Sequence, residues 1–346
     1  MIQRASRTST REALSFQKIT DKETAMTHLT GYVGTYASPG AAGTYRFLLD
    51  AESGRLSEPE LIYPQTNTKY AVWANGLLAT VTENSQGCGL ALLDPSAPGV
   101  PVLDERICER TTACFLAWQE GLLYSANYHD GHVLIHSVEN GALRPVRRLL
   151  LGEESGCHQV IFHGRWLLVP CLKRDRVFLF DREDGHAPAG ELAFPAGTGP
   201  RHGVFTADHR RFYLVSETSN QLFTYAVSGP DFTLEGVVPV LPAGFAGRAD
   251  SAAIRLRGDM LYISVRGADL IAVFSLDGDL PRLVQHADAL GRDPWDILPV
   301  PGRPLLLTAN RSSGELVCRR LEEDGAVGGE TGRLQIPQCV GLTLEA

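Results

Sequence analysis

Hydrophobic residues in this chain occur in short runs that are separated by turn residues. Typical segments are "KYAVWANGLLATVTEN", "ACFLAWQEGLLYSANY", "CHQVIFHGRWLLVPCL" and "RHGVFTADHRRFYLVSET". Each contains two apolar runs, too short for ordinary helices and joined by a tight turn, which is typical of a β-hairpin. Turn pairs such as Asn75-Gly76, Asp130-Gly131 and Asp277-Gly278 separate further strand-like runs. The pattern therefore predicts an all-β protein.

The strand pattern repeats along the chain with a nearly constant period. One position, one place into the first strand of each unit, can be followed through the copies, and successive copies are 44, 44, 44, 49, 44 and 44 residues apart. The position is occupied by Tyr70, Cys114, His158, His202, Ser251, Trp295 and Cys339, or its neighbour Val340. A period in the forties with several strands per unit indicates a β-propeller. We predict seven blades.

The seventh unit is divided between the two ends of the chain. The C-terminal "QCVGLTLEA" has the form of a first strand, and "GYVGTYASPGAAGTYRFLLD" near the N-terminus has the form of the strands that follow it. Pairing the two would close the ring and leave no open edge between the first and last blades. We predict one propeller domain over 29–346, preceded by a polar, disordered extension over 1–28.

Composition excludes several classes of partner. The chain carries 32 basic and 40 acidic side chains, a net charge of −8, which argues against nucleic acid or an anionic membrane as the main partner. It has no apolar stretch of about 18 residues and no signal-peptide core near its start. The seven cysteines form no CxxC pair. We therefore expect buried free thiols in a cytoplasmic protein.

In a propeller, the first strand of each blade lines the central channel, and the second strand returns to the same end. Residues at first-strand entries and second-strand exits should therefore meet at one mouth. We expect His158, Arg201, His202, Glu217 and Arg266 to face a shared pocket there. Further polar residues expected around the same mouth are Glu83, Asn127 and Asn310.

Simpler structural roles are open for several of these residues. Glu217 could pair with Arg201 to close the channel, and Arg266 could be a turn residue over Asp269. Asn127 also has the character of a turn-former. Asp175 and Arg176 are expected to form an ion pair.

The histidines of "HDGHVLIH", His129, His132 and His136, suggest a metal site at first sight. They straddle a predicted hairpin and have no carboxylate cage. Cys157, His158 and Cys171 lack the usual metal-ligand spacing. We expect no metal.

One stretch, "GTGPRHGVF", resembles the GxGPRHxxF element of the seven-bladed lactonase family. This family includes cycloisomerase-type 6-phosphogluconolactonases and is related to 3-carboxy-cis,cis-muconate lactonizing enzymes. "ANYHDGHVLIHSV" resembles the family's ANYxxGxVxVY hairpin, and "ISVRGADLIAVF" resembles its SNRGxDSIAVF segment. The chain departs from the family pattern at Gly156, Cys171, Val265 and Trp295, where the family has His, Asp, Asn and Arg.

The resemblance implies lactone ring chemistry in carbohydrate metabolism, in the pentose phosphate pathway for a 6-phosphogluconolactonase. His158 or Glu217 would transfer protons, and we expect His158 to titrate near neutral pH. Arg201 and Arg266 would stabilise anionic oxygens. Substrate contacts are expected from His202, Asn127, Glu83 and Asn310. No GxSxG motif is present, so a covalent acyl-enzyme is not expected.

The expected ligand is a small anionic lactone or sugar phosphate, and no cofactor is implied. Two alternatives are open: a muconate-type cycloisomerase, which Lys69 and Arg311 would favour as extra cations, and a non-enzymatic propeller that binds a partner at its mouth. The sequence carries no signal for an oligomeric state.

Overall fold

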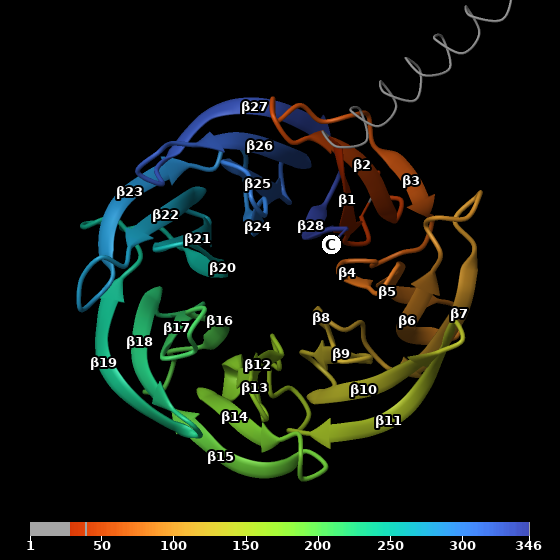
Figure 1. Cartoon of the computed structure of the whole chain (residues 1–346), viewed down its shortest axis with the longest axis horizontal. Helices are drawn as coiled ribbons and strands as arrows, with labels where there is room; N and C mark the ends of the chain where they lie inside the picture. The colour runs from red at the N-terminus through yellow and green to blue at the C-terminus, as the bar shows by residue number, and fades with distance from the viewer. Residues whose placement is uncertain (1–27, 39, 346) are drawn as a thin grey trace, which may run out of the picture.

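The computed structural model describes residues 28–38 and 40–345, and it arranges them as seven four-stranded sheets around a central channel (Figure 1). Neighbouring strands within each sheet are antiparallel. The predicted all-β, seven-bladed propeller is confirmed. The extension expected over 1–28 lies outside the described residues except for His28, the first residue of strand β1.

Each of the first six blades runs outward from the channel in chain order. Blade 1 contains β4 (Ala71–Ala74), β5 (Leu77–Asn84), β6 (Gly87–Leu93) and β7 (Val102–Glu109). Blade 2 contains β8 (Phe115–Gln119), β9 (Leu122–Asn127), β10 (His132–Glu139) and β11 (Ala142–Leu150). Blade 3 contains β12 (Ile161–His163), β13 (Trp166–Cys171), β14 (Arg176–Asp181) and β15 (Ala187–Ala193), with the short 3-10 helix η1 (Leu172–Arg174) between β13 and β14.

The next three blades repeat this arrangement. Blade 4 contains β16 (Pro200–Phe205), β17 (Arg211–Ser216), β18 (Gln221–Ser228) and β19 (Asp231–Pro239). Blade 5 contains β20 (Asp250–Arg257), β21 (Met260–Arg266), β22 (Leu270–Ser275) and β23 (Arg282–Asp288). Blade 6 contains β24 (Pro294–Pro299), β25 (Leu305–Asn310), β26 (Glu315–Leu321) and β27 (Val327–Gln335).

Blade 7 closes the ring with strands from both ends of the chain. Its inner strand is β28 (Cys339–Leu344), followed outward by β1 (His28–Thr35), β2 (Thr44–Asp50) and β3 (Glu60–Tyr63). Antiparallel pairing of β1 with β28 joins the two ends, with Val33 opposite Leu342. This is the closure predicted from the divided seventh unit, and it completes the ring between blades 6 and 1.

The hydrophobic core lies between the blades. In the described part of the chain, each junction between neighbouring blades contains one cluster of buried apolar side chains. Successive residues of a strand enter opposite clusters: Tyr32 packs toward blade 1 and Val33 toward blade 6. Because a blade is covered on both faces, its middle strands are apolar at nearly every position rather than at alternate ones.

Within the described residues, no helix has the length and hydropathy required to cross a bilayer.

Candidate active site

The inner-strand entries surround a cavity of about 190 Å³. The positions followed through the repeat that line it are Tyr70, Cys114, His158, His202, Trp295 and Val340. Ser251 does not line it; its hydroxyl donates instead to Oδ1 of Asn220, between β17 and β18 of blade 4, at 2.8 Å. The repeat register therefore brings side chains from distant parts of the chain into one site.

Glu217 lies between two guanidinium groups in this cavity. Arg201, in β16, donates a hydrogen bond from Nε to Glu217 Oε2 at 2.7 Å, and Glu217 directly follows the paired strand β17. From blade 5, Arg266 Nη2 lies 3.0 Å from the same oxygen. Burial lowers the pKa of Arg201, which is 1% exposed, while the Glu217 carboxylate opposes that shift. One carboxylate thus serves two cations, and the site has an excess of positive charge.

Arg266 has hydrogen-bonding capacity that the described residues leave unused. Its Nε donates to the Asp250 carbonyl at 3.4 Å, and its buried Nη2 has the 3.0 Å ion-pair contact with Glu217 but makes no hydrogen bond within 28–38 and 40–345. The guanidinium carbon lies 4.3 Å from the centroid of the Trp295 ring. Asp269 instead accepts a hydrogen bond from the Asp293 amide, so the alternative of Arg266 as a turn residue paired with Asp269 is not observed.

His158 and His202 contact each other beside Arg201. His202 Nε2 lies 3.2 Å from His158 Nδ1, and Arg201 Nη1 lies 3.3 Å from His202 Nδ1. Burial and the positive charge of Arg201 hold the pKa of each imidazole well below its usual value near 6.5. The expectation that His158 titrates near neutral pH is therefore wrong. Both rings are neutral at pH 7.

The turn that carries Arg201 and His202 is anchored by an aspartate from the preceding blade. Asp175 accepts hydrogen bonds from the backbone amides of Gly197 at 2.9 Å and Gly199 at 2.8 Å. Arg176 forms its ion pair with Glu191 at 3.1 Å, so the expected Asp175–Arg176 pair is wrong. Asp175 instead determines the path of the chain just before Arg201.

An aromatic and cationic cluster forms another part of the wall. The Tyr36 and Trp295 rings meet edge to face, with centroids 5.5 Å apart, and both line the cavity. Behind them, the Arg311 guanidinium lies 4.4 Å from the Tyr36 centroid and 4.8 Å from that of Trp295. Lys69 Nζ lies over the Tyr36 ring at 5.2 Å. Cation–π contacts of this kind hold each charged group against a flat apolar surface.

Three of the expected site residues do not line the cavity. Asn127 is fully buried, and its Oδ1 accepts from the Asp130 amide at 2.9 Å, as a turn-former does. Asn310 is also fully buried and donates to the Ala289 carbonyl at 3.1 Å. Glu83 accepts a hydrogen bond from the Asn67 side chain. The structure thus separates these polar residues from His158, Arg201, His202, Glu217 and Arg266, which all line the cavity.

Tyr36 and Asp296 are among the lining residues that the sequence pattern did not place at the mouth. Tyr36 directly follows β1, which is the second strand of blade 7, so extending the strand-exit register to the divided blade would have identified it. Asp296 follows Trp295 and pairs with Arg255 at 2.6 Å; burial raises the pKa of Asp296, and Arg255 opposes that shift. Nothing in its sequence pattern distinguishes Asp296 from a strand-interior residue.

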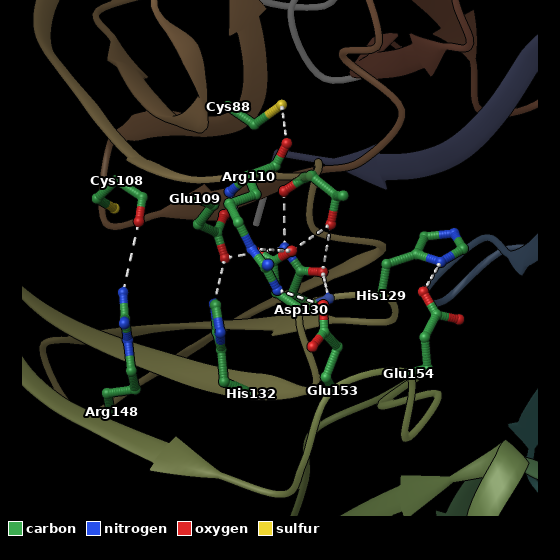
Figure 2. Close-up of polar contacts among 12 residues, drawn as sticks. Cys88, Cys108, Glu109, Arg110, His129, Asp130, His132, Arg148, Glu153 and Glu154 are labelled. Carbon is green, nitrogen blue, oxygen red and sulfur yellow. Dashed lines mark hydrogen bonds and ion pairs between the residues drawn. The ribbon is translucent and has the colours of Figure 1, made fainter.

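Two histidines of the blade 2 hairpin, His129 and His132, have separate carboxylate partners (Figure 2). His132 Nε2 lies 2.8 Å from Glu109, both side chains being buried, and His129 Nδ1 lies 2.8 Å from the exposed Glu154. In the described residues no group of three or more potential protein ligands is arranged to hold a metal ion.

The cysteines in the described residues are unpaired thiols. Cys157 and Cys171 face each other across an isolated antiparallel bridge at the entry of blade 3, with Sγ atoms 3.5 Å apart. They are fully buried and pack in the cluster between blades 2 and 3, as expected for small apolar side chains.

Comparison with known proteins supports a single family. The model of the family described as "Lactonase, 7-bladed beta-propeller" matches residues 30–343. The chain is similar to a 6-phosphogluconolactonase of Bacillus subtilis, at 29% identity over 92% of this chain and 97% of the relative. Its fold is similar to that of a Lactobacillus plantarum protein (TM-score 0.85, 24% identity, 92% and 100% coverage) and of a periplasmic gluconolactonase of Pseudomonas aeruginosa (TM-score 0.79, 23% identity, 92% and 99% coverage).

Proposed function

This chain belongs to the seven-bladed β-propeller lactonase family, and we propose that it hydrolyses a lactone bearing an anionic group, with 6-phosphogluconolactone as the first candidate. The observation that carries the proposal is the contact of Glu217 with both Arg201 and Arg266 beside a neutral histidine pair in one cavity. Proton-transfer groups and anion-stabilising groups are thus within one site, as ester hydrolysis requires.

In the proposed reaction, the oxygen of a water molecule bonds to the lactone carbonyl carbon, and a basic group takes the proton that the water loses. The carbonyl oxygen becomes negatively charged, and the ring C–O bond then breaks. The ring oxygen takes a proton and becomes a hydroxyl, so that the product is an open hydroxy acid. No cofactor is needed for this balance.

Arg266 is suited to bind the developing oxyanion. Its buried Nη2 lies 3.0 Å from Glu217 Oε2 as an ion pair but makes no hydrogen bond within the described residues, so its N–H groups can still donate to a negative oxygen. Arg201, in contrast, already donates to Glu217 and positions that carboxylate. We assign Arg266 to the oxyanion and Arg201 to the orientation of Glu217.

The proton-transfer step has two candidate bases, Glu217 and His158. Arg201 can only donate hydrogen bonds, but its Nη1 lies 3.3 Å from His202 Nδ1 and 3.4 Å from His202 Nε2, so it does not fix the His202 tautomer. The bond between His158 Nδ1 and His202 Nε2 can therefore be donated from either ring. If His158 donates, its Nε2 has a free lone pair and can accept a proton from water. If His202 donates, His158 carries its proton on Nε2 and can protonate the ring oxygen, which leaves Glu217 as the base.

The test is hydrolysis of freshly prepared 6-phosphogluconolactone by the purified protein, with spontaneous hydrolysis subtracted. We expect catalysed ring opening by the natural sequence and a strongly reduced kcat in His158→Ala with the fold intact. An intact protein that opens neither this lactone nor a panel of other sugar lactones would contradict the proposal. The free thiols support the expected cytoplasmic location of the reaction.

A second candidate reaction is the reversible lactonization of a muconate-type polycarboxylate. The observation that favours it is the additional cation in the cavity wall, Lys69, which would suit a substrate with more than one carboxylate. Incubation with 3-carboxy-cis,cis-muconate, followed by the loss of its conjugated-diene absorbance, distinguishes the two reactions.

A further inference from the structure

Lys69 lines the cavity and has no counter-ion among residues 28–38 and 40–345. Among the described residues, its ammonium group makes neither a hydrogen bond nor an ion pair, and its recorded partner is the face of Tyr36 at 5.2 Å. Burial lowers the pKa of Lys69, with Glu83 among the negative groups that oppose the shift from a distance. A half-buried ammonium group without a hydrogen-bond acceptor is costly, and an anion bound next to it would remove that cost.

The backbone that carries Lys69 is held tightly by two glycines of blade 7. A Cβ atom on Gly34 would lie 2.0 Å from the Thr68 carbonyl oxygen, and one on Gly341 would lie 2.7 Å from the Lys69 carbonyl oxygen. Close packing of this kind is possible because neither glycine has a side chain. Lys69 therefore extends into the cavity from a preorganised segment, as a binding residue should.

Lys69 and the Arg201–Glu217 pair lie on opposite sides of the channel. Lys69 lies two residues before β4, the inner strand of blade 1, whereas Arg201 is in β16 of blade 4. Three blades is the largest separation in a ring of seven, and β4 and β16 face each other across the channel in Figure 1. A ligand that contacts both sides must span the cavity.

We propose that Lys69 binds the anionic group that the lactone substrate carries at the end remote from its carbonyl. This inference builds on the proposed lactonase function and adds a specificity determinant to it. Arg201 and Arg266 are less suited to bind that group, because both contact the Glu217 carboxylate at the reacting end. The recognised group is an oxyanion, either a phosphate monoester or a carboxylate.

The chain offers a matched control for the test. Lys173 also lies over a tyrosine of the cavity wall, with Nζ 5.0 Å from the Tyr128 centroid, but it forms an ion pair with Glu154 and does not line the cavity. The experiment compares the natural sequence with Lys69→Met, Lys69→Arg and Lys173→Met. Thermal unfolding of each variant establishes that the fold is retained.

Each protein is assayed with 6-phosphogluconolactone, glucarolactone and gluconolactone, which carry a remote phosphate, a remote carboxylate and no charge. For the preferred anionic lactone, we expect Lys69→Met to raise KM about 10- to 100-fold, because the substitution removes one charge-assisted hydrogen bond to the substrate. Gluconolactone kinetics should be unaffected, Lys69→Arg should restore most of the affinity, and Lys173→Met should behave like the natural sequence. The more affected anionic lactone identifies phosphate or carboxylate as the recognised group.

Calorimetric titration with 6-phosphogluconate and with glucarate gives a readout that does not depend on catalysis. If no lactone is hydrolysed but Lys69→Met weakens binding of one of these acids, the proposed reaction fails while the anion site is supported. An equal loss of kcat/KM on gluconolactone and the anionic lactones would overturn the inference, since Lys69 would then act at the reacting end. Unchanged KM and binding in Lys69→Met would overturn it as well.

Discussion

Arg201 donates a hydrogen bond from Nε to Glu217 Oε2 at 2.7 Å across the hairpin formed by β16 and β17, and the arginine is almost completely buried. The pair is thus fixed within one blade. Arg266 approaches the same oxygen from the next blade. Replacing the carboxylate with an amide would keep the shape and the acceptor for Arg201 while removing the negative charge between the two guanidiniums.

We therefore expect Glu217→Gln to lower kcat about 10²- to 10⁴-fold, the usual contribution of a proton-transfer group. The measurement is steady-state hydrolysis of 6-phosphogluconolactone. The matched control is Glu235→Gln, which alters another arginine-paired glutamate of blade 4, 3.2 Å from Arg211, on the outer strand β19. A Glu217→Gln enzyme as fast as the control would exclude Glu217 from the proton transfer.

Stability should depend on pH through His158. Burial and Arg201 hold its folded-state pKa well below the value near 6.5 of the unfolded chain. Between those two values the unfolded state binds more protons, so the free energy of unfolding falls as the pH is lowered from about 6.5. The limiting slope is about 1.4 kcal/mol per pH unit for one proton.

Replacing His158 with Asn removes this proton uptake. We expect denaturant unfolding of His158→Asn to show a shallower loss of stability between pH 7 and pH 5 than the natural sequence shows. His129→Asn, at a histidine whose side chain is 52% exposed, is the comparison variant. Parallel stability curves for His158→Asn and the natural sequence would contradict the assignment of a buried, neutral His158.

Trp295 should position Arg266 for its role. The Arg266 guanidinium lies 4.3 Å from the Trp295 ring centroid, and a desolvated cation–π contact contributes about 0.5 to 2 kcal/mol. We expect Trp295→Leu to reduce kcat/KM about 2- to 30-fold on an anionic lactone. The control is Trp166→Leu, which removes a contact between Arg165 and the Trp166 ring at 5.2 Å. Neither residue lines the cavity, so this variant should retain its activity. Equal activities of the two variants would contradict this role.

Gly34 should be required for the position of the Lys69 segment. A methyl group there would overlap the Thr68 carbonyl oxygen, and overpacking of this kind costs about 1 to 3 kcal/mol. We expect Gly34→Ala to lower the free energy of unfolding by that amount in a denaturant titration. Gly329→Ala, where a Cβ would meet nothing within 4 Å, should have little effect. A Gly34→Ala protein as stable as Gly329→Ala would show that the packing is not tight.

Much of the site could be predicted because propeller register is a local property. His158 and His202 are one repeat apart, so a regular period placed both at inner-strand entries before any contact was known. Asn127 and Asn310 have equally regular positions, yet both turn into the blades and bind backbone groups there. The repeat pattern determines where each strand ends, whereas the rotamer of the last side chain depends on the neighbouring loop.

The sequence by itself determined the number of blades, the closure of the ring by both chain ends, and the meeting of most inner-strand entries at the channel mouth. Short apolar runs and their regular spacing are sufficient for these features, because each blade buries both faces in the same way. Only the tertiary structure decided that Glu217 contacts two arginines, that burial lowers the pKa of His158, and that Lys69, opposite them, has no counter-ion in the described part of the chain. Those properties arise from distances and burial between blades, and a one-dimensional pattern does not contain them.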